Sequence, residues 1–199
     1  MTQRSFHPLH LEDLRKSGLG DEIIDASEVY SVRPDDISRI LGWEPQEVES
    51  ALAFPYPGTD GFQRLKVFPP IKDKKGHSIK YLQRKNTGAH LYILPIVQSI
   101  LSDPNIPLGV AEGEKKTLAL IESGIMAVGI GGVWNWIDGE THMPISEISK
   151  IDWRGRKVTL YFDSDIWSRK DLLRPVYALG KELEEQGAQV EVAVLENEN

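Results

Sequence analysis

The 199-residue chain contains no cysteine, few aromatic residues (8%) and no long apolar run. The lack of cysteine excludes disulfide bonds and thiolate zinc sites, and it is consistent with a reducing compartment. The apolar runs are far too short to cross a bilayer, and the N-terminal segment from Met1 to His7 lacks the apolar core of a signal peptide. Because 40% of the residues are hydrophobic, the chain can bury one core or two small ones. We therefore expect a soluble, intracellular, folded protein with no membrane partner.

The formal net charge of −7 argues against a dedicated binder of duplex nucleic acid, because Lys and Arg supply most of the affinity for phosphates. The charge is unevenly distributed, however. Between Asp60 and His90 only two residues are acidic and eight are basic: Arg64, Lys66, Lys72, Lys74, Lys75, Lys80, Arg84 and Lys85. This basic segment is either a solvated face or a surface that follows a phosphate backbone, with neighbouring aromatic residues available for stacking.

Hydrophobic periodicity predicts three regions along the chain. Residues 1–50 form a helical cap, with short helices over 8–27 and 33–41; a helix-turn-helix reader of DNA is disfavoured because the exposed face is acidic. Residues 51–104 form a basic antiparallel β subdomain, completed by a strand over 89–94, in which Arg64 and Lys66 lie on one face and Leu65 and Val67 on the other. A short helix over 96–101 then precedes the third region.

Residues 105–199 alternate between strand and helix, which predicts an α/β domain with a mainly parallel sheet and right-handed crossovers. We expect strands at 108–112, 125–130, 158–162 and 190–195, with helices at 113–123 and 168–186. Pro175 lies inside the second helix, so the regular part of that helix is expected to begin near Leu172.

Three carboxylates follow apolar strands of this domain. Glu112 ends one strand, and Asp163 and Asp165 follow another about fifty residues later. Carboxyl ends of parallel strands meet at one edge of a sheet, so these side chains can converge on a hard divalent cation such as Mg²⁺ or Mn²⁺. The alternative is structural: Asp163 caps the next segment and Asp165 is solvated.

The segment between these strand ends contains further candidates for ligand binding. Gly131 and Gly132 permit close approach of the backbone to a ligand. The neighbouring Trp134 and Trp136 are either core residues or base-stacking groups, and Lys115 and Lys116 either contact phosphate or lie in solvent. The histidines show no metal-ligand spacing and are expected at the surface: His7, His10, His77, His90 and His142.

These motifs resemble a known family. Ala111-Glu-Gly-Glu-Lys-Lys116, Gly129-Ile-Gly-Gly-Val-Trp-Asn-Trp136 and Phe162-Asp-Ser-Asp165 are similar to the Toprim-like domain of phage and plasmid replication proteins, which is related to the catalytic core of bacterial primases. In the preceding sheet, Phe68-Pro-Pro-Ile-Lys-Asp-Lys-Lys-Gly76 and Lys80-Tyr-Leu82 also resemble primases. A second lysine of that family is replaced by Thr87, which argues against template-directed synthesis.

The resemblance implies a fold, an activity and a set of residues. The fold is a Rossmann-like Toprim domain preceded by a small helical and antiparallel β subdomain. Glu112 would act as general acid, base or metal ligand, while Asp163 and Asp165 would hold Mg²⁺. The implied residues for nucleic-acid or nucleotide binding are Arg64, Lys66, Lys80, Arg84, Lys85, Lys115, Lys116, Gly131, Gly132, Trp134 and Asn135.

Primer synthesis by a mobile-element replication protein is the first functional hypothesis. It implies single-stranded DNA and nucleotides as partners, a possible replicative helicase, and the cytoplasm of a bacterial or phage-infected cell. The alternatives are a Toprim nuclease that nicks or cuts DNA and a non-catalytic module that binds DNA or nucleotide for a helicase-primase.

Overall fold

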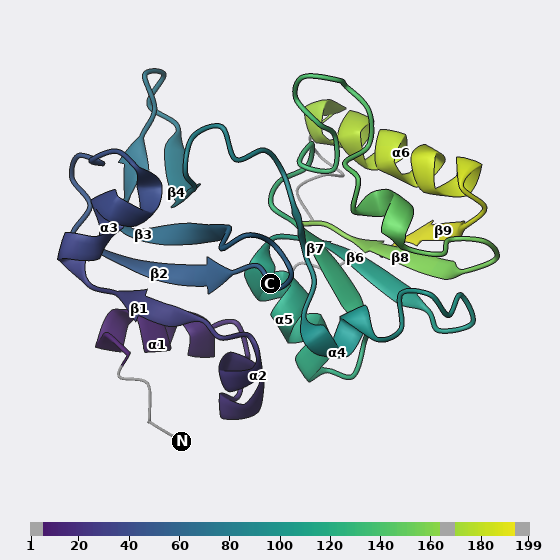
Figure 1. Ribbon diagram of the computed structural model, residues 1–199, viewed down its shortest axis with the longest axis horizontal. Coiled ribbons are helices and arrows are strands. Elements are labelled where there is room, and N and C mark those ends of the chain that lie inside the picture. Colours follow the sequence, from purple (N-terminus) through teal and green to yellow (C-terminus); the bar gives the residue numbers. More distant parts are fainter. Residues whose placement is uncertain (1–5, 164–169, 194–199) are drawn as a thin grey trace. The chain divides into compact units, whose positions relative to one another are not determined.

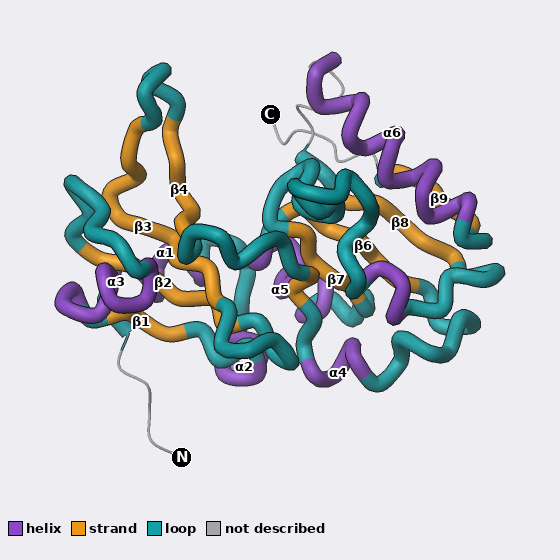
Figure 2. Tube along the Cα trace, turned by 45° about the horizontal axis from the view of Figure 1, so that its top comes forward, coloured by secondary structure: helices purple, strands orange, loops and turns teal. Residues whose placement is uncertain are grey.

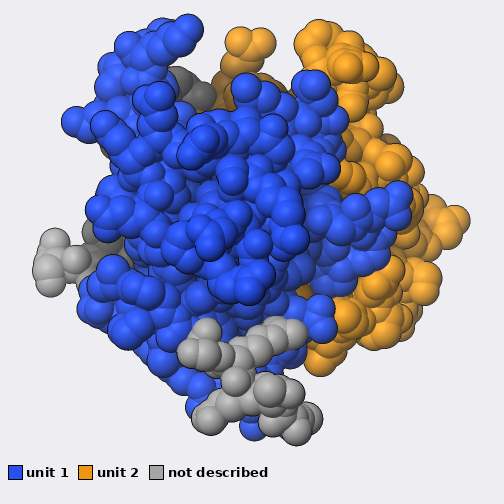
Figure 3. All heavy atoms as spheres, turned by 60° about the vertical axis from the view of Figure 1, so that its left-hand side comes forward, with its two compact units in different colours: residues 1–88 blue, residues 89–199 orange. Residues whose placement is uncertain are grey.

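The computed structural model describes residues 6–163 and 170–193. The chain divides into two compact units, residues 1–88 and 89–199 (Figure 3). Each unit has its own sheet, and each is described by itself. The finer division into 1–50, 51–104 and 105–199 stays a prediction. Among the described residues, no helix has the length and apolar character that crossing a membrane requires.

The first unit contains a four-stranded antiparallel sheet in the order β1-β2-β3-β4 (Figure 1). Its elements are α1 (Pro8–Arg15), α2 (Asp21–Ala26), β1 (Tyr30–Val32), α3 (Pro34–Leu41), β2 (Ser50–Pro55), β3 (Gln63–Lys72) and β4 (Ser78–Leu82). The predicted turns separate the last three strands. Strand β1 was not predicted, because three residues are too few to show the alternation that marks a strand.

Helix α3 packs on one face of this sheet. Pro34 occupies its first turn, and Gly42 ends it in the left-handed conformation, as the sequence predicts. The buried Ile37 and Leu41 of α3 join a core of strand residues that includes the predicted inward pair Leu65 and Val67. Fully burying a residue of this kind contributes about 1.5–3 kcal/mol relative to leaving it exposed.

The opposite face of the sheet, which carries Lys66, is not open to solvent. His10 of α1 is fully buried, and its ring nitrogens lie 2.8 Å from Ser31 Oγ and 3.0 Å from Ser50 Oγ. Lys66 Nζ donates a hydrogen bond to Asp13 of α1 at 2.5 Å. Helix α1 therefore covers this face. The prediction that the histidines lie at the surface is wrong for His10.

The second unit contains a five-stranded sheet in the order β5-β7-β6-β8-β9. Figure 2 labels the strands β7, β6, β8 and β9 of this sheet. The strands are β5 (Leu91–Tyr92), β6 (Leu108–Glu112), β7 (Ala127–Ile130), β8 (Lys157–Tyr161) and β9 (Gln189–Val192). All pairs are parallel except β5 with β7. The helices are α4 (Pro95–Gln98), α5 (Glu114–Glu122) and α6 (Lys170–Glu185), with a short 3₁₀ turn η1 (Ile148–Lys150). The α/β class and the mainly parallel sheet are confirmed.

The two crossovers run in opposite directions along the sheet, β6 to β7 through α5 and β8 to β9 through α6. Right-handed crossovers then place α5 and α6 on opposite faces, so the central strands are buried on both sides. Val110, Val128, Val158 and Leu160 are each at most 2% exposed.

Two boundary predictions need correction. The strand predicted over residues 89–94 forms β5 and pairs with β7 of the second sheet, rather than completing the antiparallel unit. A two-residue strand is assigned by its partner, which lies about forty residues away in the sequence. Helix α6 begins at Lys170 and continues through Pro175, instead of beginning near Leu172.

Candidate active site at the carboxyl edge of the parallel sheet

Glu112 lies at the carboxyl end of the central strand β6. Its neighbours are set by the register: Glu112 is opposite Ile130 at the end of β7, and Ala111 is opposite Tyr161 at the end of β8. The Glu112 side chain is half-buried. Glu112 thus stands between the ends of two neighbouring parallel strands, in the position where open α/β sheets bind ligands.

Asp163 follows β8 by two residues and reaches the same edge. The register places Phe162 beside Glu112, and Phe162 is 1% exposed, which anchors the strand end in the core. The next residue, Asp163, is 71% exposed at its side chain. Because neighbouring strands lie about 4.8 Å apart, Glu112 and Asp163 belong to one lip of the sheet. Asp165 lies outside the described residues.

Helix α5 connects these two strand ends through an ion pair. Lys116, in the first turn of α5, donates from Nζ to Asp163 Oδ1 at 2.5 Å. Gly113 makes the turn between β6 and α5 with φ of 90°, a conformation that favours glycine, and its N–H donates to Ile130 O at 2.8 Å. The Glu112-Gly113 turn is therefore tied to β7 on one side, and Lys116 reaches β8 on the other.

Close packing of α5 against the sheet fixes this geometry. Thr117 is fully buried, and its Oγ1 donates to Gly113 O at 2.9 Å. A Cβ atom added to Gly129 of β7 would lie 2.5 Å from Thr117 Oγ1, so only glycine fits there. Glu114, the first residue of α5, is also fully buried. Sequence reasoning missed Glu114 and Thr117, since burial in a first turn depends on how the helix meets the sheet.

The loop after β7 holds the predicted glycines and tryptophans. Gly131 and Gly132 are half-buried; a Cβ atom at Gly132 would make only ordinary contacts, the nearest at 3.7 Å to the Asn135 side chain. Trp136 is 4% exposed and belongs to the core, whereas Trp134 is 42% exposed. Of the two predicted alternatives, a core position therefore applies to Trp136, whereas Trp134 lies at the surface.

The two arginines of the basic segment that are predicted to bind nucleic acid, Arg64 and Arg84, make contacts within the first unit. Arg64 Cζ lies 5.1 Å from the centroid of the Tyr81 ring. Arg84 donates to Ile40 O at 3.2 Å and to Arg39 O at 3.1 Å, which satisfies carbonyls at the C-terminal end of α3.

The lysines that are predicted to bind nucleic acid differ in how exposed their side chains are. Lys66 is only 13% exposed at its side chain and is ion-paired with Asp13. Lys80 is exposed on β4, and Lys85 is exposed with its Nζ 5.3 Å from the centroid of the Trp43 ring. Lys115 in the second unit is half-buried. Lys80 and Lys85 are thus the lysines of this set that face solvent in the first unit.

The carboxylates fit a divalent cation by their chemistry. Glu112 and Asp163 supply hard oxygen donors, the kind that Mg²⁺ prefers, and Mg²⁺ commonly completes its coordination with water and substrate phosphates. In the described part of the chain, no three His, Asp or Glu side chains form a metal-binding group. Positive charge beside Asp163 comes from the Lys116 ammonium. Any cation shared by these carboxylates must therefore coexist with Lys116 or displace it.

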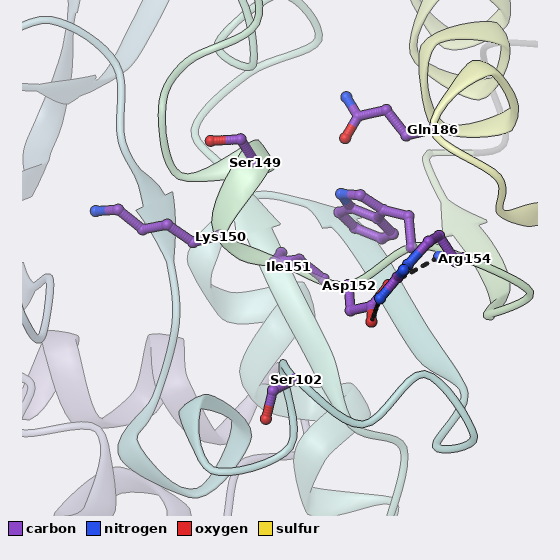
Figure 4. A pocket seen from close by; sticks show the side chains of 8 residues that line it. Ser102, Ser149, Lys150, Ile151, Asp152, Arg154 and Gln186 are labelled. Atoms are coloured by element: carbon purple, nitrogen blue, oxygen red, sulfur yellow. Dashed lines mark hydrogen bonds and ion pairs between the residues drawn. The ribbon is translucent and has the colours of Figure 1, made fainter.

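A pocket of about 390 Å³ lies at the opposite, amino edge of the sheet (Figure 4). It is lined by residues that precede β6, β8 and β9, including Ser102, Lys150 and Gln186. Arg154 and Asp152 lie side by side in its lining and make a bidentate ion pair, with Nη2 to Oδ2 at 2.8 Å and Nε to Oδ1 at 3.0 Å. These hydrogen bonds lower the pKa of Asp152 to about 2. Asp152 and Arg154 of this pocket are thus paired with each other. The grouping of Glu112, Asp163 and Lys116 lies at the other edge of the sheet.

Comparison with known proteins gives one family and one fold. A family model described as a domain of unknown function, DUF3854, matches residues 97–199, just over half of the chain. No curated protein matches the chain significantly.

Three solved structures share the fold at low identity. The Aquifex aeolicus primase, in a crystal structure of its zinc-binding and RNA polymerase domains, is 14% identical with a TM-score of 0.64, over 95% of this chain and 50% of that one. The DnaG catalytic core is 21% identical with a TM-score of 0.63, over 99% and 67%. The DnaG primase catalytic domain bound to single-stranded DNA is 22% identical with a TM-score of 0.61, over 99% and 69%. The chain spans half the length of the Aquifex structure, and these identities establish the fold alone.

Proposed function

The chain belongs to the DUF3854 family, and we propose that it performs Mg²⁺-dependent phosphodiester chemistry on nucleic acid, as the primase-like core of a mobile-element DNA replication protein. Two findings support the proposal. The chain has the fold of the DnaG catalytic core, and one of the DnaG structures of this fold is bound to single-stranded DNA. The carboxyl edge of its parallel sheet also carries Glu112, Asp163 and Lys116, which are residue types that such chemistry uses.

We assign roles to residues of this edge and to Asp165, which lies two positions after Asp163 in the sequence. Asp163 and Asp165 hold the divalent cation, Mg²⁺ or Mn²⁺, and Glu112 is a further ligand or the general acid or base. When bound there, such a cation would neutralise charge on phosphate oxygens and help to orient the attacking hydroxyl. Lys116 and Lys115 contact phosphate from the first turn of α5, where the helix dipole also favours an anion.

The first unit supplies a surface for the nucleic-acid backbone. Lys80 and Lys85 are exposed, and we assign them to phosphate contacts. Arg64 and Arg84 keep their positive charge while they contact Tyr81 and α3, and they add to the local field. We do not assign Lys66 to phosphate contacts, because its ammonium is largely buried and paired with Asp13.

The observation that carries the proposal is the Lys116–Asp163 ion pair beside Glu112. It brings a lysine ammonium and two carboxylates, separated by about fifty residues of sequence, to one edge of one sheet. A surface ion pair of this kind contributes only about 0–1 kcal/mol to stability, so fold stability gives little reason to hold these charges together.

Primer synthesis is tested with single-stranded DNA, labelled nucleoside triphosphates and Mg²⁺. We expect labelled primers from the wild-type chain, and a loss of about 100-fold or more in Glu112→Gln and Asp163→Asn, as is typical for groups that act in the transition state. Glu122→Gln is the matched control, since Glu122 is an exposed glutamate at the C-terminal end of α5.

The same incubation separates the other hypotheses. Shortened template without primers indicates a Toprim nuclease, and binding without turnover or Mg²⁺ dependence indicates a non-catalytic module for a helicase-primase. If Glu112→Gln and Asp163→Asn keep the activity of Glu122→Gln, the assignment of the site is wrong.

A further inference from the structure

The loop over residues 131–147 is held in a defined shape by its own hydrogen bonds. The Asp138 carboxylate accepts from Thr141 N at 2.7 Å, Thr141 Oγ1 at 2.9 Å and Glu140 N at 3.1 Å, and these bonds lower the pKa of Asp138. Ile137 and Pro144 form an isolated β-bridge. The loop is therefore a scaffold that holds its side chains in fixed places.

Trp134 is mounted on this scaffold with its ring at the surface. Its ring centroid lies 6.5 Å from that of Trp136, and the two ring planes differ by 23°. Trp136 is 4% exposed, so it forms a rigid support, while Trp134 remains 42% exposed. Leaving a large aromatic ring in water forgoes the stabilisation that burial would give, which argues against a core role for Trp134.

The loop starts next to the candidate active site. It follows Ile130, which is opposite Glu112 in the sheet and accepts the hydrogen bond from Gly113 N at 2.8 Å. The strand ends that carry Trp134, Glu112 and Asp163 are thus consecutive along one edge, in the order β7-β6-β8. The loop and Lys116 therefore lie at the same edge of the sheet.

We propose that Trp134 is a stacking platform for an unpaired nucleobase, which defines the substrate as single-stranded nucleic acid. The inference rests on the proposed function for the identity of the ligand. A nucleobase is flat and aromatic, and stacking on an exposed ring is worth about 1–3 kcal/mol per base without sequence preference. Bases in a duplex are already stacked on each other and cannot offer a free face, so the platform favours single strands.

The test compares two labelled oligonucleotides of equal length, oligo-dT and an abasic strand with the same phosphates. Binding to the full chain is measured by fluorescence anisotropy without divalent metal, so that no turnover occurs. We expect the wild type to bind oligo-dT about 5- to 150-fold more tightly than the abasic strand, the range that corresponds to the stacking energy of one base.

Three variants identify the source of this preference. Trp134→Ala should bring the affinities for the two strands close together, while Trp134→Phe retains a ring and most of the preference. Met143→Ala is the control, because Met143 is 63% exposed in the same loop but has no flat face. A calorimetric titration with a nucleoside triphosphate shows whether the platform serves the strand or a free nucleotide: we expect Trp134→Ala to leave that affinity unchanged.

The outcomes are distinct from those of the activity assay. If Trp134→Ala keeps the preference for oligo-dT, weakens binding to both strands equally, or weakens only the triphosphate, the platform assignment is overturned. A preference that depends on Trp134 supports the inference even when no primer or cleavage product forms. Conversely, an active enzyme with an unaffected Trp134→Ala variant retains the proposed function and loses the platform.

Discussion

Arg156 provides the sharpest test of how the second unit is held together. Its side chain is fully buried, and the guanidinium donates to four backbone carbonyls: Asp152 O, Ile106 O and Leu101 O at 2.8 Å each, and Ile100 O at 3.3 Å. Burial lowers the pKa of this arginine, with Asp152 and Asp103 opposing the shift. Arg156 thus connects the segment before β8 to the segment before β6, the strand that ends at Glu112.

We predict that Arg156→Met lowers the free energy of unfolding by about 3–5 kcal/mol. Met replaces most of the apolar contacts, but the carbonyls that lose their donor each cost roughly 1–3 kcal/mol when they stay buried. Relief of the buried positive charge offsets part of this loss. The free energy of unfolding of Arg156→Lys should lie between those of the wild type and Arg156→Met, because one ammonium cannot reproduce the fixed fork of donors.

Urea denaturation of the full chain measures this change, and hydrogen exchange of β6 and β8 amides assigns it to the second unit. Arg154→Met is the matched control, since Arg154 is two residues away, 84% exposed and paired only at the surface with Asp152. We expect that control to cost less than about 1 kcal/mol. A cost below about 1 kcal/mol for Arg156→Met itself would refute the argument from the four carbonyls.

Two further predictions concern charge. Burial, followed by the nearby His7, lowers the pKa of His10 from 6.5 to about 4, so the folded first unit holds His10 neutral. In the unfolded chain His10 takes up a proton below about pH 6.5, so the free energy of unfolding should be unaffected above that pH and fall by about 2 kcal/mol between pH 7.5 and 5. Urea titrations at both pH values should show this fall in the wild type and not in His10→Gln. Equal pH dependence in the two proteins would contradict the prediction. Lys116→Gln frees the Asp163 carboxylate and removes a neighbouring positive charge, so the affinity for Mn²⁺ should rise several-fold. Electron paramagnetic resonance of the free ion measures this affinity. An unchanged affinity would mean that Lys116 and the cation do not compete.

The sequence was informative wherever local chemistry sets the structure. Glu112-Gly113 marks a strand end because only glycine readily adopts the positive φ of that turn. The runs before Glu112 and Asp163 are short and mostly apolar rather than alternating, which is typical of strands buried on both faces. The parallel sheet and the shared edge of these two residues could therefore be predicted.

The remaining features depend on contacts between distant segments. His10 and Lys66 look like surface residues in sequence, but α1 packs on the first sheet, so His10 is fully buried and the Lys66 side chain is only 13% exposed. Arg156 bonds to carbonyls about fifty residues away, which no periodicity reveals. The division of roles between Trp134 and Trp136 likewise follows from the path of their loop, since both residues have the same local composition.

The central claim is that Glu112 and Asp163 share one divalent cation at the carboxyl edge of the sheet. A crystal structure of the full chain with Mn²⁺ and a nucleotide tests it most directly, because the anomalous signal of Mn²⁺ locates the ion without assumptions about activity. The account predicts a peak within coordination distance, about 2.0–2.4 Å, of an oxygen from each carboxylate and of a phosphate oxygen. A Mn²⁺ ion bound elsewhere, with Lys116 still paired to Asp163, would contradict it.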